Sequence, residues 1–306
     1  MASNTSNEAP FFASHPIIVT GGRDFDFIPA IYDFLDKIHL EKPVDLLIHG
    51  GARGADSVAD SWALDRGIKT HVFTARWEDG KAAGPKRNSR MLNSYPAATL
   101  VSFPGGAGTR DCTSKALKMG LKVIYFDLIL YPATQEMIVR RELKKNLYEP
   151  TQEGITHINA YSRSGSDLGR FLSNFAQATF KTPFGPFLTI EGYWYYLRFM
   201  NSGAPDHLLQ SLKNLSGENA KRLGKELEKN FNPWNELRLP ERIFRDLIAE
   251  AIILKLLSAP ENIVRRLKEI SRLPLVHYYI FNNAPVHGGY DWWVELMEEI
   301  IMELTR

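Results

Sequence analysis

The sequence predicts an α/β fold: a doubly wound, mostly parallel sheet in its first part, followed by a mainly helical α+β domain. Three observations indicate this. Short β-branched runs alternate with helical stretches between about residues 16 and 128, which is typical of a parallel sheet covered by helices. After residue 156 the sequence becomes rich in aromatic and turn-forming residues, and then helical. A chain of 306 residues is long enough for about two domains.

The first domain is expected at residues 14–130. Helices are predicted between its strands, at 28–40, 55–66, 88–94 and 113–119. In a sheet of this kind ligands bind at the carboxyl ends of the strands. The five predicted strands are 17–20, 44–49, 69–74, 98–103 and 122–126.

Residues 131–155 are expected to connect the domains, because they combine Pro132, Pro150 and a charged helical run. The second domain is expected at 156–306. Its helical pattern from about 205 to 272 is broken at prolines. The apolar run 275–281 and a last helix at about 290–304 complete it.

The composition excludes several classes of protein. The net charge is only +2, from 37 basic and 35 acidic residues, so there is no overall field typical of a dedicated nucleic-acid binder. The single cysteine, Cys112, excludes an internal disulfide and fits a reducing cytosol. We find neither a secretion signal nor an 18-residue apolar run, which predicts a cytoplasmic protein without membrane contact. The histidines show no metal-ligand spacing, so no metal and no cofactor are expected.

Three glycine-rich turns each follow a predicted strand. Glycine lets the backbone approach a ligand closely, and the first N–H groups of a helix attract negative charge. The alternative is that some of these glycines only form tight turns. The predicted phosphate-binding residues of the turns are Gly21 and Gly22; Gly50, Gly51 and Gly54; and Gly105, Gly106, Gly108 and Thr109.

Charged residues accompany these turns. Arg23, Arg53 and Arg87 could bind phosphate oxygens through two N–H groups each, unless they are simply solvated. Asp24 and Asp56 could accept hydrogen bonds from ribose hydroxyls. Asn88, which closes the segment AGPKRN at 83–88, is placed with the nucleotide-binding set.

Residues 16–126 resemble the SLOG superfamily of Rossmann-like nucleotide-binding domains, which includes YspA-related proteins, the phosphoribohydrolases and the recombination mediator DprA. The resemblance rests on VTGGRDF at 19–25, HGGARGAD at 49–56, AGPKRN at 83–88 and FPGGAGT at 103–109. It is greatest for a small branch common in bacteria and phages, so the chain is similar to phage-encoded members. The resemblance implies a nucleotide ligand and, as is common in the superfamily, a homo-oligomer.

One departure from the superfamily affects the chemistry. The phosphoribohydrolases have the motif PGGxGTxxE, and here Cys112 replaces its glutamate. Asp111 precedes that position by one residue, about 100° around a helix, and would not substitute. We therefore expect this domain to bind without hydrolysis. Cys112 has no partner pattern of a nucleophile and is expected to be a packing residue.

Residues 156–306 resemble the NADAR family, YbiA-like N-glycosidases that act on riboflavin-pathway intermediates or ADP-ribosylated nucleobases. FLSNF at 171–175 matches the family's opening segment, and TIEGYWYYLRF at 189–199 resembles its next helix. AKRLG at 220–224 and LMEEI at 296–300 resemble later helices. In this chain Gly192, Tyr195 and Arg198 replace the family's histidine, glutamine and lysine.

Cleavage of an N-glycosidic bond needs a carboxylate beside the anomeric carbon and a holder for the base. Glu191 is the predicted carboxylate, with Asn174 to bind ribose or position it and Asp291 as a second candidate. Tyr193 and Trp194 are predicted to stack on the base, and Arg198 is the candidate cation. Alternatively, Glu191 only complements a helix dipole, and the aromatic residues are core.

Three functions follow. The first is an N-glycosidase acting on an ADP-ribose-like or ADP-ribosylated-base substrate, coupled to a nucleotide-binding domain. The second is a non-catalytic sensor or sponge for an NAD-derived nucleotide, in nucleotide signalling or phage–host conflict. The third is phosphoribohydrolase or DNA-binding activity in the first domain. The expected partners are thus a nucleotide or ADP-ribose-like small molecule and, for the first function, a modified nucleic-acid base.

Overall fold

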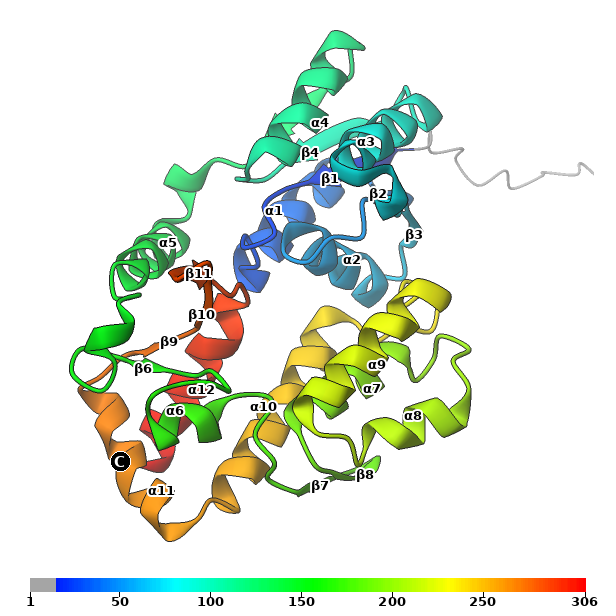
Figure 1. The fold of residues 1–306 in the computed structure, drawn as a ribbon. Helices are drawn as coiled ribbons and strands as arrows, with labels where there is room; N and C mark the ends of the chain where they lie inside the picture. The colour runs from blue at the N-terminus through cyan, green and yellow to red at the C-terminus, as the bar shows by residue number, and fades with distance from the viewer. Residues whose placement is uncertain (1–14) are drawn as a thin grey trace, which may run out of the picture. The chain divides into compact units, whose positions relative to one another are not determined.

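The computed structural model describes residues 15–306. It divides into two compact units, the first ending at Phe126 and the second comprising Asp127–Arg306 (Figure 1). The expected start of the first domain at residue 14, and the polar stretch before it, lie outside the described residues. Each unit is described by itself below.

The first unit contains a five-stranded, fully parallel sheet with the strand order β3-β2-β1-β4-β5. This confirms the predicted doubly wound α/β fold. Ile18 in the central strand pairs with Ile48 on one side and with Leu100 on the other, and all three are buried. The strands are β1 (Pro16–Thr20), β2 (Leu46–His49), β3 (Lys69–Val72), β4 (Thr99–Ser102) and β5 (Val123–Tyr125).

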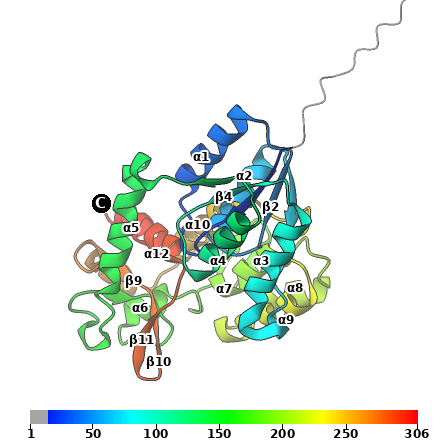
Figure 2. The same ribbon diagram turned by 90° about the horizontal axis from the view of Figure 1, so that it is seen from above.

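Helices cover both faces of this sheet (Figure 2). Helices α1 (Ile28–Glu41) and α2 (Ala55–Asp65) pack together, and α3 (Ala83–Ser94) packs against α4 (Ala107–Lys118). Cys112 of α4 lies in the buried cluster with Met91 and Leu100. Burial raises the pKa of its thiol to about 11, so Cys112 is the packing residue that the sequence predicted.

Two helices begin earlier than expected. Helix α3 starts at Ala83 rather than 88, after the short 3-10 helix η1 (Trp77–Ala82), and α4 starts at Ala107 rather than 113. Pro85 therefore lies in the first turn of α3, where its missing N–H leaves no hydrogen bond unmade. The first turns of both helices contain glycine, which disfavours helices, so the sequence pattern did not indicate a helix there.

The second unit has its core between helices α7 (Ile190–Phe199), α10 (Glu241–Leu257) and α12 (Asp291–Leu304). Helices α8 (Asp206–Leu212) and α9 (Gly217–Asn230) pack on α7. Three pairs of short strands accompany them. The remaining elements are η2 (Leu128–Leu130), η3 (Pro150–Gln152), β6 (Ile158–Asn159), α6 (Asp167–Leu172), β7 (Phe180–Thr182), β8 (Gly185–Phe187), α11 (Glu261–Leu267), η4 (Lys268–Ser271), β9 (Leu275–Val276), β10 (Tyr278–Phe281) and β11 (Ala284–His287).

The segment expected to connect the domains contains helix α5 (Pro132–Lys145), which belongs to the second unit. Arg141 of α5 donates two hydrogen bonds of 2.8 Å to the carboxylate of Glu295 in α12. Lys144 lies 2.6 Å from Glu298 on the same helix. Two ion pairs thus fix α5 to the last helix of the chain.

Candidate functional sites

The carboxyl ends of β1 and β4 lie next to each other at the point where the strand order changes direction, which is where open α/β sheets bind ligands. Gly22, after β1, donates its N–H to the carbonyl of Pro104, after β4, at 2.8 Å. A Cβ on Gly54 would come within 2.3 Å of the Gly22 carbonyl oxygen. The three glycine turns therefore meet at one edge of the sheet through backbone contacts.

The turn before α4 is the open part of this edge. Gly105, Gly106 and Gly108 are exposed, and a Cβ on Gly106 or Gly108 would meet nothing within 4 Å. No side chain caps the start of α4. Its first N–H groups and positive dipole end are therefore suited to an anion. Thr109 is buried, with its hydroxyl close to Gly105.

Arg87 of α3 occupies the space that Gly50 leaves by having no side chain. A Cβ on Gly50 would lie 1.2 Å from Arg87 Nη1. Nη1 donates to the Phe73 carbonyl at 3.3 Å, while Nε is buried and has no hydrogen-bond partner within residues 15–306. A half-buried arginine whose buried Nε–H has no partner is suited to an anionic ligand.

The other charged residues mainly organise the turns. Arg53 donates to Asp24 at 2.9 Å, and Arg23 is exposed on the turn after β1. One carboxylate oxygen of Asp56 accepts from the N–H groups of Gly50 (3.0 Å) and Ala52 (3.2 Å). Asp56 thus shapes a glycine turn. The sequence had suggested a hydrogen bond to ribose for this residue and not these backbone contacts.

Two further residues support these turns. Asn88 donates to the Gly108 carbonyl at 3.3 Å and to Asp111 at 3.0 Å, so it links α3 to α4. His49 is buried, with its Nε2 2.8 Å from the carboxylate of Asp60. Its Nδ1 accepts from the N–H of Gly51 at 3.1 Å, so Nε2 must carry the proton. A buried His–Asp pair therefore fixes the second turn.

The sequence of the first unit is similar to that of known proteins. Residues 15–80 match the family model described as "YspA, cpYpsA-related SLOG family". The Gene 61 protein of Mycobacterium phage D29 is 36% identical over 119 residues, a match that covers 36% of this chain and 94% of that protein. The chain belongs to the YspA, cpYpsA-related SLOG family. Its SLOG domain indicates a nucleotide-related function. No solved structure gives a significant match.

The family match does not extend past residue 80, so the site predicted in the second unit depends on geometry. Thr189 caps α7, its hydroxyl accepting from the N–H of Gly192 at 3.1 Å. Glu191 lies in the first turn and donates its own N–H to the Asn174 carbonyl at 3.1 Å. Asn174 Oδ1 is buried without a hydrogen-bond partner among the described residues. The segment FLSNF and the start of α7 are thus joined by a backbone hydrogen bond.

Glu191 has a carboxyl group whose pKa is raised. Burial raises its pKa to about 7, against the opposing effect of Lys221 and Lys225 on α9. Glu228, also on α9, acts in the raising direction. No role was predicted for these α9 residues from the sequence. A signal was present, because Lys221 and Lys225 are four residues apart and share one face of the helix.

The predicted stacking residues differ in their surroundings. Tyr193 is 1% exposed and packs against Phe187, with ring centroids 4.8 Å apart. Its ring has no open face for a base, so the core alternative holds for Tyr193. Trp194 is half-buried and lies between Phe244 and Trp292.

The two remaining candidates have partners of their own. Burial alone would raise the pKa of Asp291, but a 2.8 Å hydrogen bond with His287 and the nearby cations lower it. The Arg198 guanidinium lies 6.0 Å from the centre of the Phe244 ring. Trp194 contacts Tyr290 and Trp292, on either side of Asp291, which places the start of α12 beside α7.

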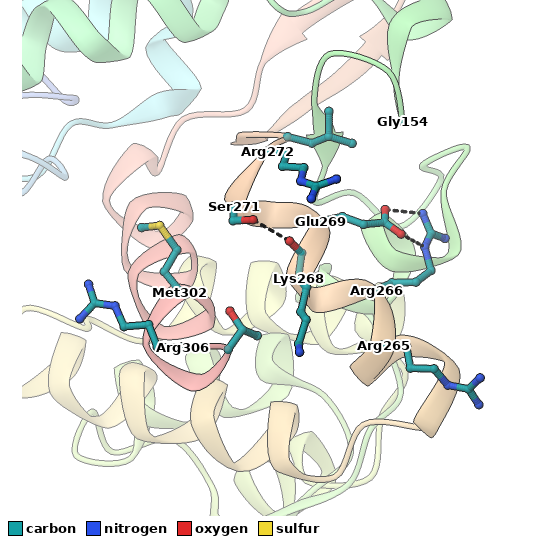
Figure 3. Close-up of a pocket in the computed structure, with 11 residues that line it drawn as sticks. Gly154, Arg265, Arg266, Lys268, Glu269, Ser271, Arg272, Met302 and Arg306 are labelled. Carbon is teal, nitrogen blue, oxygen red and sulfur yellow. Dashed lines mark hydrogen bonds and ion pairs between the residues drawn. The ribbon is translucent and has the colours of Figure 1, made fainter.

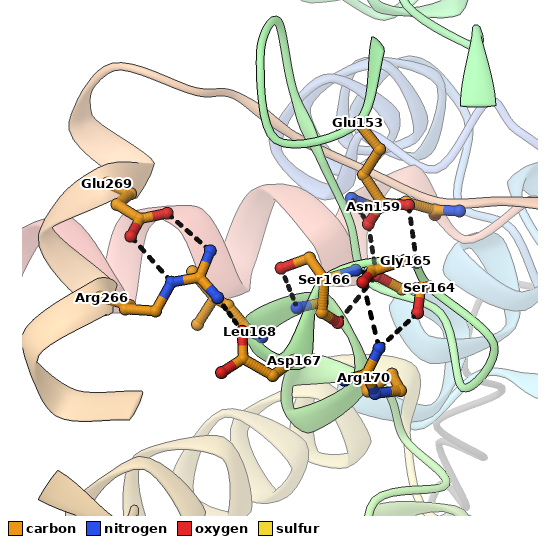
Figure 4. Close-up of polar contacts among 11 residues, drawn as sticks. Glu153, Asn159, Ser164, Gly165, Ser166, Asp167, Leu168, Arg170, Arg266 and Glu269 are labelled. Carbon is orange, nitrogen blue, oxygen red and sulfur yellow. Dashed lines mark hydrogen bonds and ion pairs between the residues drawn. The ribbon is translucent and has the colours of Figure 1, made fainter. Parts of the chain in front are cut away.

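A polar network holds the loop that leads into FLSNF (Figure 4). The Glu153 carboxylate accepts from the Ser164 hydroxyl and from the N–H groups of Asn159 (3.3 Å) and Gly165 (3.1 Å). Arg170 donates to the Ser164 carbonyl at 2.8 Å. These contacts fix helix α6, which begins in this loop. Asn174 follows two residues after the end of that helix.

A separate hollow of about 990 Å³ lies beside α11, η4 and the end of α12 (Figure 3). Arg266 is paired there with Glu269 and Asp167. The long side chains of Arg265, Lys268 and Arg306 point in different directions and do not converge on one position. None of the predicted site residues lines this hollow.

Residues 15–306 contain no cluster of three or more His, Cys, Asp or Glu side chains suited to a metal ion. Over the same residues, no helix has the length and apolar character needed to cross a membrane.

Proposed function

We propose that the second unit is an N-glycosidase that hydrolyses the N-glycosidic bond of an ADP-ribose-like or ADP-ribosylated-base substrate. The observation that carries this proposal is Glu191, a half-buried carboxyl with a pKa of about 7 whose backbone N–H binds the segment holding Asn174. A perturbed carboxyl beside an unpaired polar group is typical of catalytic sites.

The mechanism follows from these groups. Departure of the base leaves positive charge on the ribose, which the ionised Glu191 carboxylate would stabilise while it orients the attacking water. Asn174 Oδ1 would accept from a ribose hydroxyl and so obtain its missing hydrogen bond. Lys221 and Lys225, which favour the ionised form of Glu191, are suited to the phosphates of the same ligand.

For the SLOG domain we propose nucleotide binding without hydrolysis. The open turn at Gly105–Gly108 would hold the phosphate, with Arg87 alongside. The carboxylate of the phosphoribohydrolase motif has no counterpart here, since Cys112 is buried and Asp111 is bound to Asn88 and Lys115. Release of free base from nucleoside monophosphates by the Glu191→Gln protein would contradict this proposal.

The second candidate is a sensor or sponge for an NAD-derived nucleotide, favoured by the same replacement at Cys112. Mass spectrometry of the nucleotide that copurifies with the protein, combined with an assay of base release from ADP-ribosylated guanine, separates the two. Turnover supports the glycosidase. Stoichiometric recovery of an unchanged nucleotide, without base release from any candidate, supports the sensor.

The pH dependence of the reaction is the first test. Because Glu191 must be ionised to act, kcat/KM is expected to rise with pH and to level off above the pKa of about 7. Below that pKa it should fall by about tenfold per pH unit. Measurement of kcat/KM between pH 5 and 9 checks this. A rate that increases towards acid would instead identify a protonated Glu191 as the active form.

The guanidinium of Arg87 allows a second test. We expect Arg87→Gln to weaken binding of AMP to the SLOG domain by about tenfold to a hundredfold, because a hydrogen bond to a charged group contributes about 1.5–3 kcal/mol. Arg90→Gln is the matched control, because Arg90 lies on the same helix and donates to the Thr74 carbonyl at 2.8 Å. Calorimetry should show a normal affinity for the control. Equal affinities for both variants would remove Arg87 from the site.

A further inference from the structure

Lys255 is a buried lysine that the proposed reaction does not use. It lies in the last turn of α10 and is 2% exposed. Its ammonium donates to the Ser173 carbonyl at 2.7 Å and lies 5.1 Å from the centre of the Phe171 ring. Within residues 15–306 no carboxylate forms an ion pair with it. Burial alone accounts for the lowering of its pKa to about 7.

This arrangement is costly for an ordinary packing position. Removing an ammonium group from water without a counter-ion costs several kcal/mol, and only one of its three donors has a partner here. A leucine or methionine would fill the same volume without that cost. Unlike leucine or methionine, a lysine at this position can donate a hydrogen bond to the Ser173 carbonyl.

The contact lies directly beside the candidate site. Ser173 precedes Asn174, whose own carbonyl accepts the N–H of Glu191 at 3.1 Å. Two successive carbonyls are therefore held from two different helices, one by α10 and one by the first turn of α7. The Asn174 side chain, with its unpaired Oδ1, leaves the backbone between these two contacts.

We propose that Lys255 is a positioning residue: its ammonium holds the Ser173 carbonyl and thereby fixes the Asn174 amide beside Glu191 for the ribose of the ligand. This inference rests on the proposed function of that site. It assigns Lys255 no contact with the ligand and no step in the chemistry.

The test uses the full chain with Glu191→Gln, which removes the titration of Glu191, and ADP-ribose as the probe. With Lys255 present, affinity is expected to fall by about fivefold to tenfold as the pH rises from 6 to 8.5, because a neutral amine makes the weaker hydrogen bond. Lys255→Arg should retain the high affinity with no change over this range. Lys255→Met should bind weakly throughout. A fall with pH that persists in Lys255→Arg overturns the proposal.

Hydrogen exchange gives a readout that needs no ligand. Lys255→Met should speed exchange at residues 171–176 and at the Glu191 amide by about tenfold or more, although global stability does not fall. Ser258→Ala is the control, because the Ser258 hydroxyl binds the backbone carbonyl of Lys255 and leaves its ammonium untouched. If ADP-ribose does not bind, the proposed function fails while exchange still tests Lys255. Unchanged exchange in Lys255→Met contradicts the positioning role.

Discussion

Glu191→Gln is expected to lower the kcat of base release by about a thousandfold, since the loss of a general base or charge-stabilising carboxylate typically costs a factor of 10² to 10⁴. The amide has the same shape as the carboxyl, and the N–H of residue 191 still binds the Asn174 carbonyl. KM should therefore change little. Steady-state kinetics on an ADP-ribosylated base measure both constants.

Glu228→Gln is the matched control, because Glu228 lies beside Glu191 and pairs with Lys225 at 2.6 Å. Removing its charge should lower the pKa of Glu191 and shift the pH profile towards acid, with kcat nearly intact.

The stability of the folded protein gives a second check on Glu191. The pKa of Glu191 is raised from 4.5 to about 7, so its contribution to stability is complete below pH 4.5 and is lost as the pH rises through 7.

Glu191→Gln should consequently gain stability relative to the wild type at pH 8 but not at pH 4. Full activity of this variant would show that Glu191 only complements the dipole of α7.

Gly54→Ala is expected to destabilise the first unit by about 3 kcal/mol or more, because two penalties add at this position. The residue has a φ of +79° and a ψ of −131°, a conformation that is essentially restricted to glycine. The new Cβ would also come within 2.3 Å of the Gly22 carbonyl oxygen and 2.5 Å of the Arg23 carbonyl oxygen. Both obstacles are backbone atoms and cannot rotate away.

Gly84→Ala gives the comparison, because Gly84 is helical and a Cβ there would meet nothing within 4 Å. It should stabilise the unit by about 0.5–1 kcal/mol. Urea titrations followed by circular dichroism measure both variants. A Gly54→Ala protein as stable as the wild type would mean that the second glycine turn can open without loss.

The first unit was predictable because its signals are local. A β-branched run followed by glycines fixes a strand, its end and the edge of the sheet on which that end lies. The roles of Asp24 and Asp56 could not be predicted from local signals. Arg53 binds Asp24, and the N–H groups of Gly50 and Ala52 bind Asp56, only after the turns have formed. A sequence shows that a carboxylate is present at a turn but not whether the backbone uses it.

The second unit was less predictable for a related reason. Glu191 and Asn174 could be singled out by the resemblance of their surroundings, but the pKa of Glu191 depends on burial and on lysines that approach from α9. Tyr193 shows the reverse case, an aromatic residue beside the candidate carboxyl that packs into the core. Lys255 gave no signal at all, because its importance arises only from the carbonyl it meets 82 residues earlier in the chain.

The ion pairs between α5 and α12 affect the order in which this protein can fold during synthesis. Arg141 and Lys144 are translated early, yet Glu295 and Glu298 lie 154 residues further on. The first unit is complete by Phe126 and can form its sheet while the ribosome is still working. Helix α5 must wait, with its charges in water, until the last residues emerge. A ribosome that stalls before residue 295 would thus present a folded SLOG domain followed by an unanchored helix, which is a natural target for cellular proteases.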